Sequence, residues 1–310
     1  MKVLHLSDTT LSGSPYRASK LISKYSEIQS RHIVFQRKIF DRVFDVDLCG
    51  EEMSRDEIMH WLEWADVYHF HNRWKRQNTL KGIELPKKPS VIQIHSPRSS
   101  EDFSQEVNSG IPLAIIAQYH TREWPEKSFV VPNCVDILDP AYLPISRSIN
   151  GAPVVSYAPS NANMKGWDDK SYDLVAPILK RMKLEGRIQY QFIFKKPHSE
   201  AMALKKLAHI GIEEVSTGSY HMSGLEYLAL GVACICHIDK LTEATVKDLT
   251  GCYKLPFIEA TKSSFRSTLI RLIEDRGYQA NAGISSREWM EQYWHPKKLV
   301  NHYKSMYERL

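Results

Sequence analysis

Short apolar runs rich in valine and isoleucine alternate along the chain with longer segments in which apolar residues recur every three or four positions. The short runs predict buried strands and the longer segments predict amphipathic helices. Such an alternation is typical of βα units around a parallel sheet, so we expect an α/β fold. In the first half, strands are expected near 2–6, 32–35, 67–71, 91–95, 113–117 and 129–131, with helices at 16–26 and 55–64.

The alternation is interrupted once and then resumes. Between residues 139 and 151 the chain carries two prolines, a glycine and polar residues, which is typical of a linker. A domain boundary is therefore expected there, with a first domain over 1–145 and a second over 151–285. In the second domain, strands are expected near 153–157, 189–194, 214–216, 233–237 and 252–255, and helices near 170–184, 199–208, 223–230, 244–249 and 263–274. One or two further helices are expected over 286–310.

The composition indicates a globular protein without stable membrane insertion. Hydrophobic residues make up 43% and charged residues 25% of the chain. The longest apolar stretches, 111–117 and 228–235, fall short of the ~20 residues that span a bilayer. The amino terminus resembles a first strand rather than a signal peptide, so a cytoplasmic location is expected. The net charge of +5 permits a polyanionic partner without requiring one.

Candidate metal ligands are few, and no metal site is predicted. The five cysteines contain no CxxC pair and are expected to be reduced and mostly buried. Asp45 and Asp47 form a DxD pattern, which is short enough to occur by chance. His69 and His71 share one face of a strand, but no acidic or cysteine residue lies nearby in the sequence. We expect His71 to line a ligand cleft and His69 to pack inside.

A loop and helix in the second half carry the first candidate chemistry. Two glycines, Gly218 and Gly224, flank the start of a helix expected near Ser223, with Glu226 in its first turn. Backbone N–H groups at such a helix start can bind a phosphate, and the Glu226 carboxylate could accept hydrogen bonds from ribose hydroxyls. The alternative is an ordinary capped helix with an acidic first turn.

A second loop follows the first strand of the second domain. It reads Tyr157-Ala158-Pro159-Ser160-Asn161 and continues to Lys165-Gly166. Ligands of doubly wound sheets bind outside the carboxyl ends of the strands, so Lys165 is placed to meet a diphosphate. The alternative is a solvated loop lysine.

Together these motifs resemble the retaining GT-B glycosyltransferases of the sucrose synthase-like superfamily, the glycosyl transferases group 1. The segment 131–136 resembles the element that precedes their interdomain crossover, and 65–71 and 92–96 resemble their first-domain strands. The resemblance implies two Rossmann-like domains facing each other across a cleft, with 286–310 packing back towards the first domain. It also implies transfer with retention from a nucleotide-sugar, a UDP- or GDP-sugar, without a metal or other cofactor.

The resemblance assigns roles to individual residues. Glu226 would bind the ribose, Lys165 the diphosphate and His95 the donor sugar, and Gly13 would let the backbone approach the phosphates. Two positions depart from the superfamily pattern, because Gly218 replaces a glutamate and Ser160 replaces an arginine; Lys195 or Lys196 could compensate for the missing charge. The candidate catalytic residues are His71, His95 and Lys165, and the candidate donor-binding residues are Gly13, Ser160, Lys165, Lys195, Gly218, Ser219, Tyr220, Ser223, Gly224, Leu225 and Glu226.

The segment from His71 to Arg98 is rich in basic residues: it contains seven of them and one acidic residue, Glu84. Cations interleaved with an aromatic residue suit a polyanion with stackable faces, so we expect an acceptor of duplex DNA with hydroxymethylated bases. Phage enzymes that glycosylate hydroxymethylcytosine act on such DNA, and a phage-encoded chain would work in the host cytoplasm. The candidate acceptor-binding residues are Arg73, Trp74, Lys75, Arg76 and Arg98.

Three alternatives stay open. The acceptor could be a surface glycan or its lipid carrier, which is the commoner acceptor class in the superfamily. The same two-domain fold also serves sugar-nucleotide epimerases. The departures at Gly218 and Ser160 also fit a nucleic-acid or glycan-binding module without catalysis.

Overall fold

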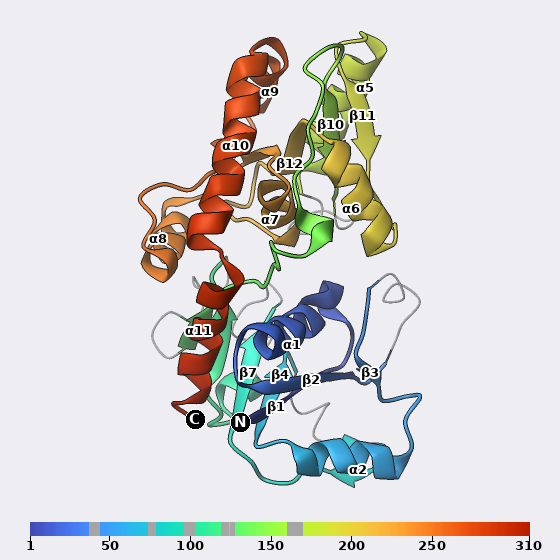
Figure 1. The fold of residues 1–310 in the computed structure, drawn as a ribbon, viewed down its shortest axis with the longest axis vertical. Coiled ribbons are helices and arrows are strands. Elements are labelled where there is room, and N and C mark those ends of the chain that lie inside the picture. Colours follow the sequence, from blue (N-terminus) through green and yellow to red (C-terminus); the bar gives the residue numbers. More distant parts are fainter. Residues whose placement is uncertain (37–43, 74–78, 96–102, 119–123, 125–127, 160–169) are drawn as a thin grey trace. The chain divides into compact units, whose positions relative to one another are not determined.

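The computed structural model describes residues 1–310 except 37–43, 74–78, 96–102, 119–123, 125–127 and 160–169. The chain groups into two compact units. Unit 1 comprises Met1–Cys134 and Pro296–Leu310, and unit 2 comprises Val135–His295. Each unit is built on a parallel sheet flanked by helices (Figure 1). The domain limits expected from the sequence, at 145, 151 and 286, stay a prediction.

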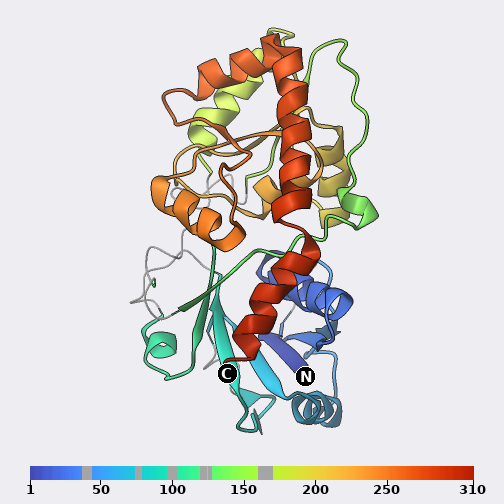
Figure 2. The ribbon, with the colours of Figure 1, turned by 60° about the vertical axis from the view of Figure 1, so that its left-hand side comes forward.

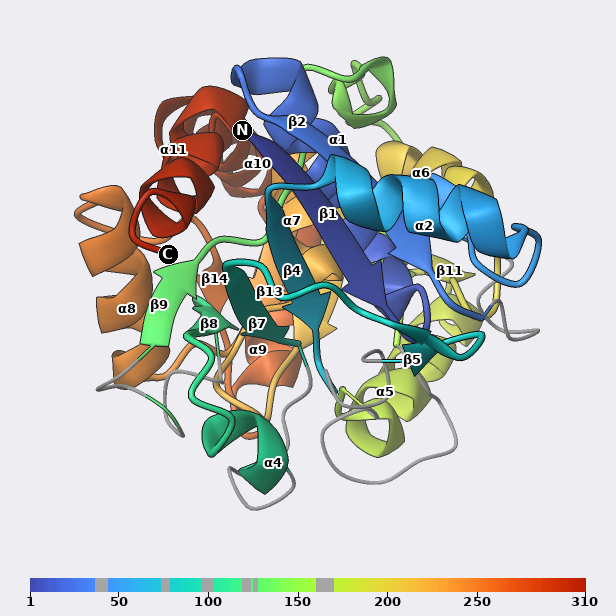
Figure 3. The same cartoon turned by 90° about the horizontal axis from the view of Figure 1, so that it is seen from below.

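Unit 1 contains a parallel sheet with the strand order β3-β2-β1-β4-β7-β8-β9 (Figures 1 and 3). The order reverses direction beside β1, and such a switch point in a doubly wound sheet is where ligands bind, outside the carboxyl ends of the strands. The strands are β1 (Lys2–Ser7), β2 (Gln29–Val34), β3 (Leu48–Cys49), β4 (Val67–His71), β7 (Ser90–Ile94), β8 (Leu113–Ile116) and β9 (Ser128–Val131), with a small antiparallel pair β5 (Thr79–Leu80) and β6 (Ile83–Glu84).

One face of this sheet is apolar and is covered by α2 (Arg55–Trp64). Ser54 caps α2 by accepting a hydrogen bond from the Glu57 amide, while the Glu57 carboxylate accepts one from the Ser54 amide. This capping box fixes where the helix begins. Ile58 and Leu62 then pack against strand residues such as Leu4, so the helix predicted at 55–64 is confirmed.

The opposite face is polar because β-strand side chains alternate between the two faces. It is contacted by α1 (Ser14–Tyr25) and by α11 (Pro296–Tyr307), which also pack against each other. His5 pairs with His69 across β1 and β4, and Ser7 pairs with His71, so all four side chains share this face. The chain ends marked N and C both belong to unit 1 and lie side by side (Figures 1 and 2).

Unit 2 contains a second parallel sheet, with the order β11-β10-β12-β13-β14. Its strands are β10 (Val154–Tyr157), β11 (Gln189–Phe192), β12 (Ile210–Glu214), β13 (Ala233–Cys236) and β14 (Ile258–Glu259). Two sequence predictions were wrong. The strand expected at 214–216 lies at 210–214, because its last two residues are buried glutamates that resemble a loop in the sequence. The strand expected at 252–255 is instead irregular, and β14 follows it.

Helices surround the sheet of unit 2: α5 (Tyr172–Leu184), α6 (His198–Leu207), α7 (Met222–Ala229), α8 (Lys240–Thr250), α9 (Phe265–Glu274) and α10 (Arg276–Tyr293), the long helix of Figure 2. A side chain on Gly283 of α10 would approach the Gly231 carbonyl oxygen to 2.4 Å, so glycine permits close packing there. The Arg287 guanidinium donates to the carbonyl oxygens of Ala229 and Tyr142, the latter in the short helix η4 (Pro140–Tyr142). No described helix is long and apolar enough to cross a membrane.

Candidate functional site

The loop after β12 is held by a buried carboxylate. Glu214 accepts hydrogen bonds from the amides of Ser216, Thr217 and Gly218 at 2.8, 2.5 and 3.2 Å. Gly218 has a φ of +75°, and a Cβ there would lie 2.9 Å from the Cβ of Asp239. A side chain at position 218 would therefore be both strained and crowded. This gives a physical reason for a glycine at the position where the superfamily that the sequence motifs resemble has a glutamate.

Helix α7 follows this loop and is seated on the sheet through Tyr227. A Cβ on Gly211 of β12 would lie 2.4 Å from the Tyr227 ring, so only glycine leaves room for it. The Tyr227 hydroxyl also hydrogen-bonds the Ser156 hydroxyl at 2.8 Å. The helix begins at Met222, and Glu226 consequently lies in its second turn rather than in the first turn expected from the sequence.

Glu226 is held by two side chains of α6. Its Oε1 lies 2.9 Å from His198 Nε2, and its Oε2 accepts a hydrogen bond from Lys205 Nζ. Lys205 also donates to the Ser223 hydroxyl at 2.8 Å. Glu226 and Lys205 are 5% and 3% exposed, so the carboxylate is fixed in position by a buried cation. A carboxylate oxygen has two lone pairs, so each of these oxygens can accept more than one hydrogen bond.

Lys205 and His198 were not predicted from the sequence. They are seven residues apart on one helix, which places them on the same face. That spacing is the only signal in the sequence, and it is shared by many surface pairs.

Glu213 forms a second buried cluster beside α7, which was also not predicted from the sequence. A bulge at this position in β12 re-aims the side chain, and its carboxylate lies against Gly224 in the first turn of α7. Glu213 Oε1 lies 2.6 Å from both Lys170 Nζ and His221 Nδ1. Burial alone would raise the pKa of Glu213, but the Lys170 charge and the hydrogen bond with His221 outweigh it and lower the pKa to about 2.

The other predicted donor-binding residues differ in what they can offer. The side chains of Ser219, Tyr220 and Leu225 are buried, and Tyr220 packs against Trp294 and Phe257, so these residues can present only main-chain groups to a ligand. Lys195 follows β11, has a φ of +52°, and its ammonium lies 5.1 Å from the centre of the Phe194 ring. Ser160 and Lys165 lie outside the described residues, so their placement stays a prediction.

The loop after β1 in unit 1 turns through three consecutive left-handed residues. Leu11, Ser12 and Gly13 have φ values of 45°, 55° and 76°. Two of them are not glycine, and such strain is typical of functional loops. The loop leads into α1, whose start has no side-chain cap, and Arg17 donates to the Ser12 carbonyl oxygen. Arg17 was not predicted, although it adds a cation to a helix start suited to an anion.

Two predicted catalytic residues of unit 1 are in contact. His71 Nδ1, at the end of β4, lies 2.7 Å from His95 Nε2, just after β7. His71 is fully buried, so its connection to the surface runs through the partly exposed His95. Asn72, with a φ of +61°, accepts a hydrogen bond from the His95 amide at 2.7 Å and fixes that backbone.

The predicted acceptor residues are only partly described. Arg73 follows β4 and its guanidinium carbon lies 5.9 Å from the centre of the Phe103 ring. Trp74, Lys75, Arg76 and Arg98 lie outside the described residues.

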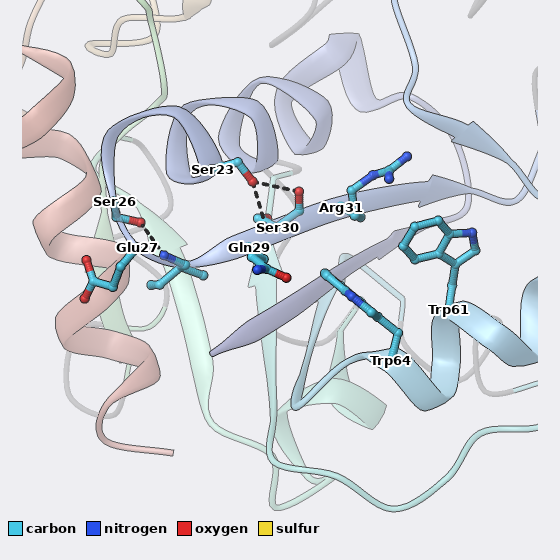
Figure 4. A pocket seen from close by; sticks show the side chains of 9 residues that line it. Ser23, Ser26, Glu27, Gln29, Ser30, Arg31, Trp61 and Trp64 are labelled. Atoms are coloured by element: carbon cyan, nitrogen blue, oxygen red, sulfur yellow. Dashed lines mark hydrogen bonds between the residues drawn. The ribbon is translucent and has the colours of Figure 1, made fainter.

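A surface cavity of about 350 Å³ lies at the amino-terminal end of β2, between the carboxyl-terminal ends of α1 and α2 (Figure 4). Arg31 stacks on Trp61 with 4.4 Å between the guanidinium carbon and the ring centre, and it forms two hydrogen bonds with Asp47. Ser23 donates to the Ser30 carbonyl oxygen. The cavity lies away from the carboxyl ends of the strands, and Asp47 of the DxD pattern is engaged by Arg31.

The two parallel α/β sheets together define the GT-B fold of glycosyltransferases. Three examples of the solved structures to which the chain is similar match it along nearly the full length of both chains. These are sucrose-phosphate synthase from Thermosynechococcus elongatus (TM-score 0.61, 9% identity, 100% of this chain and 99% of that one), Anabaena HepE in complex with UDP and glucose (0.64, 13%, 100% and 100%), and an α-glucosyltransferase in complex with UDP (0.63, 11%, 99% and 100%). No protein-family model and no curated protein matches the chain.

Proposed function

We propose that this protein is a glycosyltransferase that moves a sugar from a nucleotide-sugar donor to a hydroxyl acceptor. The observation that carries the proposal is Glu226, a buried carboxylate that Lys205 and His198 hold in α7, the helix that follows the carboxyl end of β12. A carboxylate fixed in this way is suited to accept hydrogen bonds from both hydroxyls of a ribose. The similar HepE and α-glucosyltransferase structures contain UDP, so a UDP-sugar is the first donor to test.

Transfer requires stabilisation of the departing diphosphate, on which negative charge grows as the sugar bond breaks. We assign this role to Lys165, Lys195 and the main-chain amides that lead into α7, because fixed cations and dipoles stabilise such charge without a metal. Retention follows if the acceptor oxygen attacks the anomeric carbon from the face that the diphosphate leaves. The leaving phosphate then accepts the acceptor proton, so no strong base is required from the protein.

A panel of UDP- and GDP-sugars tests the proposal. Purified protein should release free nucleotide from one donor when an acceptor is present, and the anomeric configuration of the product reports retention. Conversion of the donor sugar without nucleotide release would indicate an epimerase instead. Binding of ligands without any turnover would indicate a non-catalytic module.

For the acceptor, we propose duplex DNA with hydroxymethylated bases. The support is the excess of basic residues between His71 and Arg98, of which Arg73 lies two residues beyond the end of β4. Such an enzyme would have to flip its target base out of the duplex. Binding to DNA should weaken steeply with salt, and Arg73→Ala with Arg76→Ala should reduce it. Transfer to a glycan or lipid-linked acceptor, with none to hydroxymethylated DNA, would refute this acceptor.

A further inference from the structure

The cavity at the amino-terminal end of β2 lies at the edge of the unit 1 core (Figure 4). Gln29 and Arg31 alternate with the buried Ile33, so they lie on the face of the sheet that α2 covers. Trp61 and Trp64 are three residues apart on α2, which places both indoles on one side of the helix. The cavity therefore begins where the apolar contact between β2 and α2 ends.

The indole rings of Trp61 and Trp64 form the apolar wall of the cavity. Both rings are partly buried, because they pack against the core cluster of unit 1. They meet edge to face, with 5.4 Å between the ring centres and 76° between the planes. Figure 4 shows both rings projecting from α2 towards β2. Among the described residues neither indole N–H has a hydrogen-bond partner, so both remain available as donors.

The wall formed by the end of α1 and the start of β2 is polar and preorganised. The Ser23 hydroxyl donates to the Ser30 carbonyl oxygen at 2.8 Å and accepts from the Ser30 amide at 2.7 Å. The Ser26 hydroxyl accepts from the Ile28 amide at 3.1 Å and so fixes the turn between α1 and β2. A wall fixed in this way loses little conformational entropy when a ligand binds.

Gln29 adds the one side-chain amide of the cavity. Gln29 is exposed at the start of β2, and within the described part of the chain its amide group has no hydrogen-bond partner. A side-chain amide can donate and accept at the same time. It is therefore suited to a ligand whose groups do the same, such as a hydroxyl.

The charged residues that line the cavity are already paired. Among the described residues these are Glu27 and Arg31. The Glu27 carboxylate accepts a hydrogen bond from Lys304 of α11. The Arg31 guanidinium forms two hydrogen bonds with Asp47, at 2.7 and 2.8 Å. An ionised ligand would have to displace one of these partners, so the cavity suits a neutral, polar ligand.

Two classes of aromatic-bound ligand fit less well. A flat base is bound by stacking on aromatic faces, but the planes of Trp61 and Trp64 are inclined at 76° and leave no parallel slot. A quaternary ammonium is bound over the ring faces. Here, however, the Arg31 guanidinium lies 4.4 Å from the centre of the Trp61 ring, and the Lys2 ammonium lies 5.8 Å from that of Trp64. Cations of the protein itself already occupy these positions.

We propose that the cavity binds a neutral saccharide unit. A pyranose ring has C–H groups on its faces and hydroxyls around its edge, so it can pack on an indole while it exchanges hydrogen bonds with the Gln29 amide. The volume of about 350 Å³ lies within the range of about 300–1,000 Å³ that small-molecule sites occupy. Strand β2 is six residues long, so its carboxyl end lies about 17 Å away. The saccharide is thus bound apart from the candidate catalytic residues of unit 1.

NMR of the indole N–H groups in the full chain tests this site. Maltotriose, cellotriose, mannotriose and chitotriose are added one at a time, without a nucleotide-sugar. We expect at least one of them to shift the signals of Trp61 and Trp64, which Trp61→Phe and Trp64→Phe identify. Absence of a shift with all four, or shifts caused only by uridine monophosphate or choline, would overturn the proposal. Because no donor is present, failure here is distinct from failure of the proposed transfer.

Gln29→Ala removes the exposed amide and leaves the core contacts of both tryptophans in place. The Kd of the bound trisaccharide should rise about fivefold, the equivalent of one neutral hydrogen bond. Gln36→Ala, the same change at an exposed position two residues after β2, is the matched control and should leave the Kd unchanged. Equal affinities of the two variants would contradict the saccharide site.

Discussion

Units 1 and 2 share the same kind of parallel sheet, yet they bury polar side chains in opposite ways. Unit 1 places uncharged imidazoles in a hydrogen-bonded chain. Unit 2 buries ion pairs, Lys170 with Glu213 and Lys205 with Glu226. A network of neutral groups is stabilised by its hydrogen bonds, whereas a network of charged groups is stabilised by the pairing of opposite charges. The two units should therefore respond differently to acid and to the loss of one partner.

Acid should give the largest difference. In unit 1, burial lowers the pKa of His32 and His69 to about 3 and that of His5 and His71 well below the ordinary value. The unfolded chain takes up these protons near pH 6.5, so the stability is present above that pH and is lost as the pH falls towards 3. The loss is about 1.4 kcal/mol per pH unit for each histidine, or about 5.5 kcal/mol per pH unit for all four.

Unit 2 should respond later. The pKa of Glu213 is lowered to about 2, so its contribution is lost only as the pH falls from about 4.5 towards 2. Hydrogen exchange measured by mass spectrometry between pH 7 and 5 should show peptides of unit 1 losing protection first. Simultaneous loss in both units, or earlier loss in unit 2, would contradict the comparison.

The second largest effect should come from removal of one member of a buried ion pair. Lys170→Met leaves the fully buried Glu213 without its cation, which should cost about 3–5 kcal/mol of unfolding free energy. Lys170→Met combined with Glu213→Leu should recover most of the loss, because no buried charge remains. Urea denaturation measures both. The control Lys247→Met removes an exposed partner of Glu243 and should leave the urea midpoint unchanged.

A smaller effect is expected where unit 2 meets its ligand. Glu226→Gln keeps the shape but removes the charge that would accept ribose hydroxyls, so kcat/KM for the donor should fall about 10- to 100-fold. Glu200→Gln on α6 removes an exposed partner of Lys196 and should have no effect. Equal activity of the two variants would show that Glu226 does not bind the donor.

Removal of metal should have the smallest effect. With cations and main-chain dipoles assigned to the diphosphate, activity should survive excess chelator. Loss of activity that manganese or magnesium restores would assign a metal to the reaction and would reopen the roles of Asp45 and Asp47, and of the buried group His5, His69 and His71.

Local pattern predicted most of the elements of this fold. The apolar run at Val67–His71 and the capped segment at Arg55–Trp64 match β4 and α2 at both ends, because alternation and capping are written into neighbouring residues. The sequence failed where burial depends on distant partners. Glu213 and Glu214 end a strand because Lys170 and the amides of the next loop satisfy their charges, and no nearby residue indicates this.

The candidate site shows the same limit. Alternation along β4 places His69 and His71 on one face. The connection from His69 to His5, however, runs through the hydroxyl of Tyr307, which is 238 residues beyond His69. Similarly, Glu226 could be found from its motif, whereas Lys205 could not, because a lysine on a helix is usually solvated.

Helix α11 follows unit 2 in the chain, although Tyr303 and Tyr307 belong to unit 1. Translation at about 5–20 residues per second means that the sheet of unit 1 emerges from the ribosome on the order of ten seconds before the helix that covers it. An apolar face exposed for that time would be prone to aggregate. A face of imidazoles can remain hydrated until α11 has been synthesised. The histidines therefore also suit synthesis of this chain from its amino terminus to its carboxyl terminus.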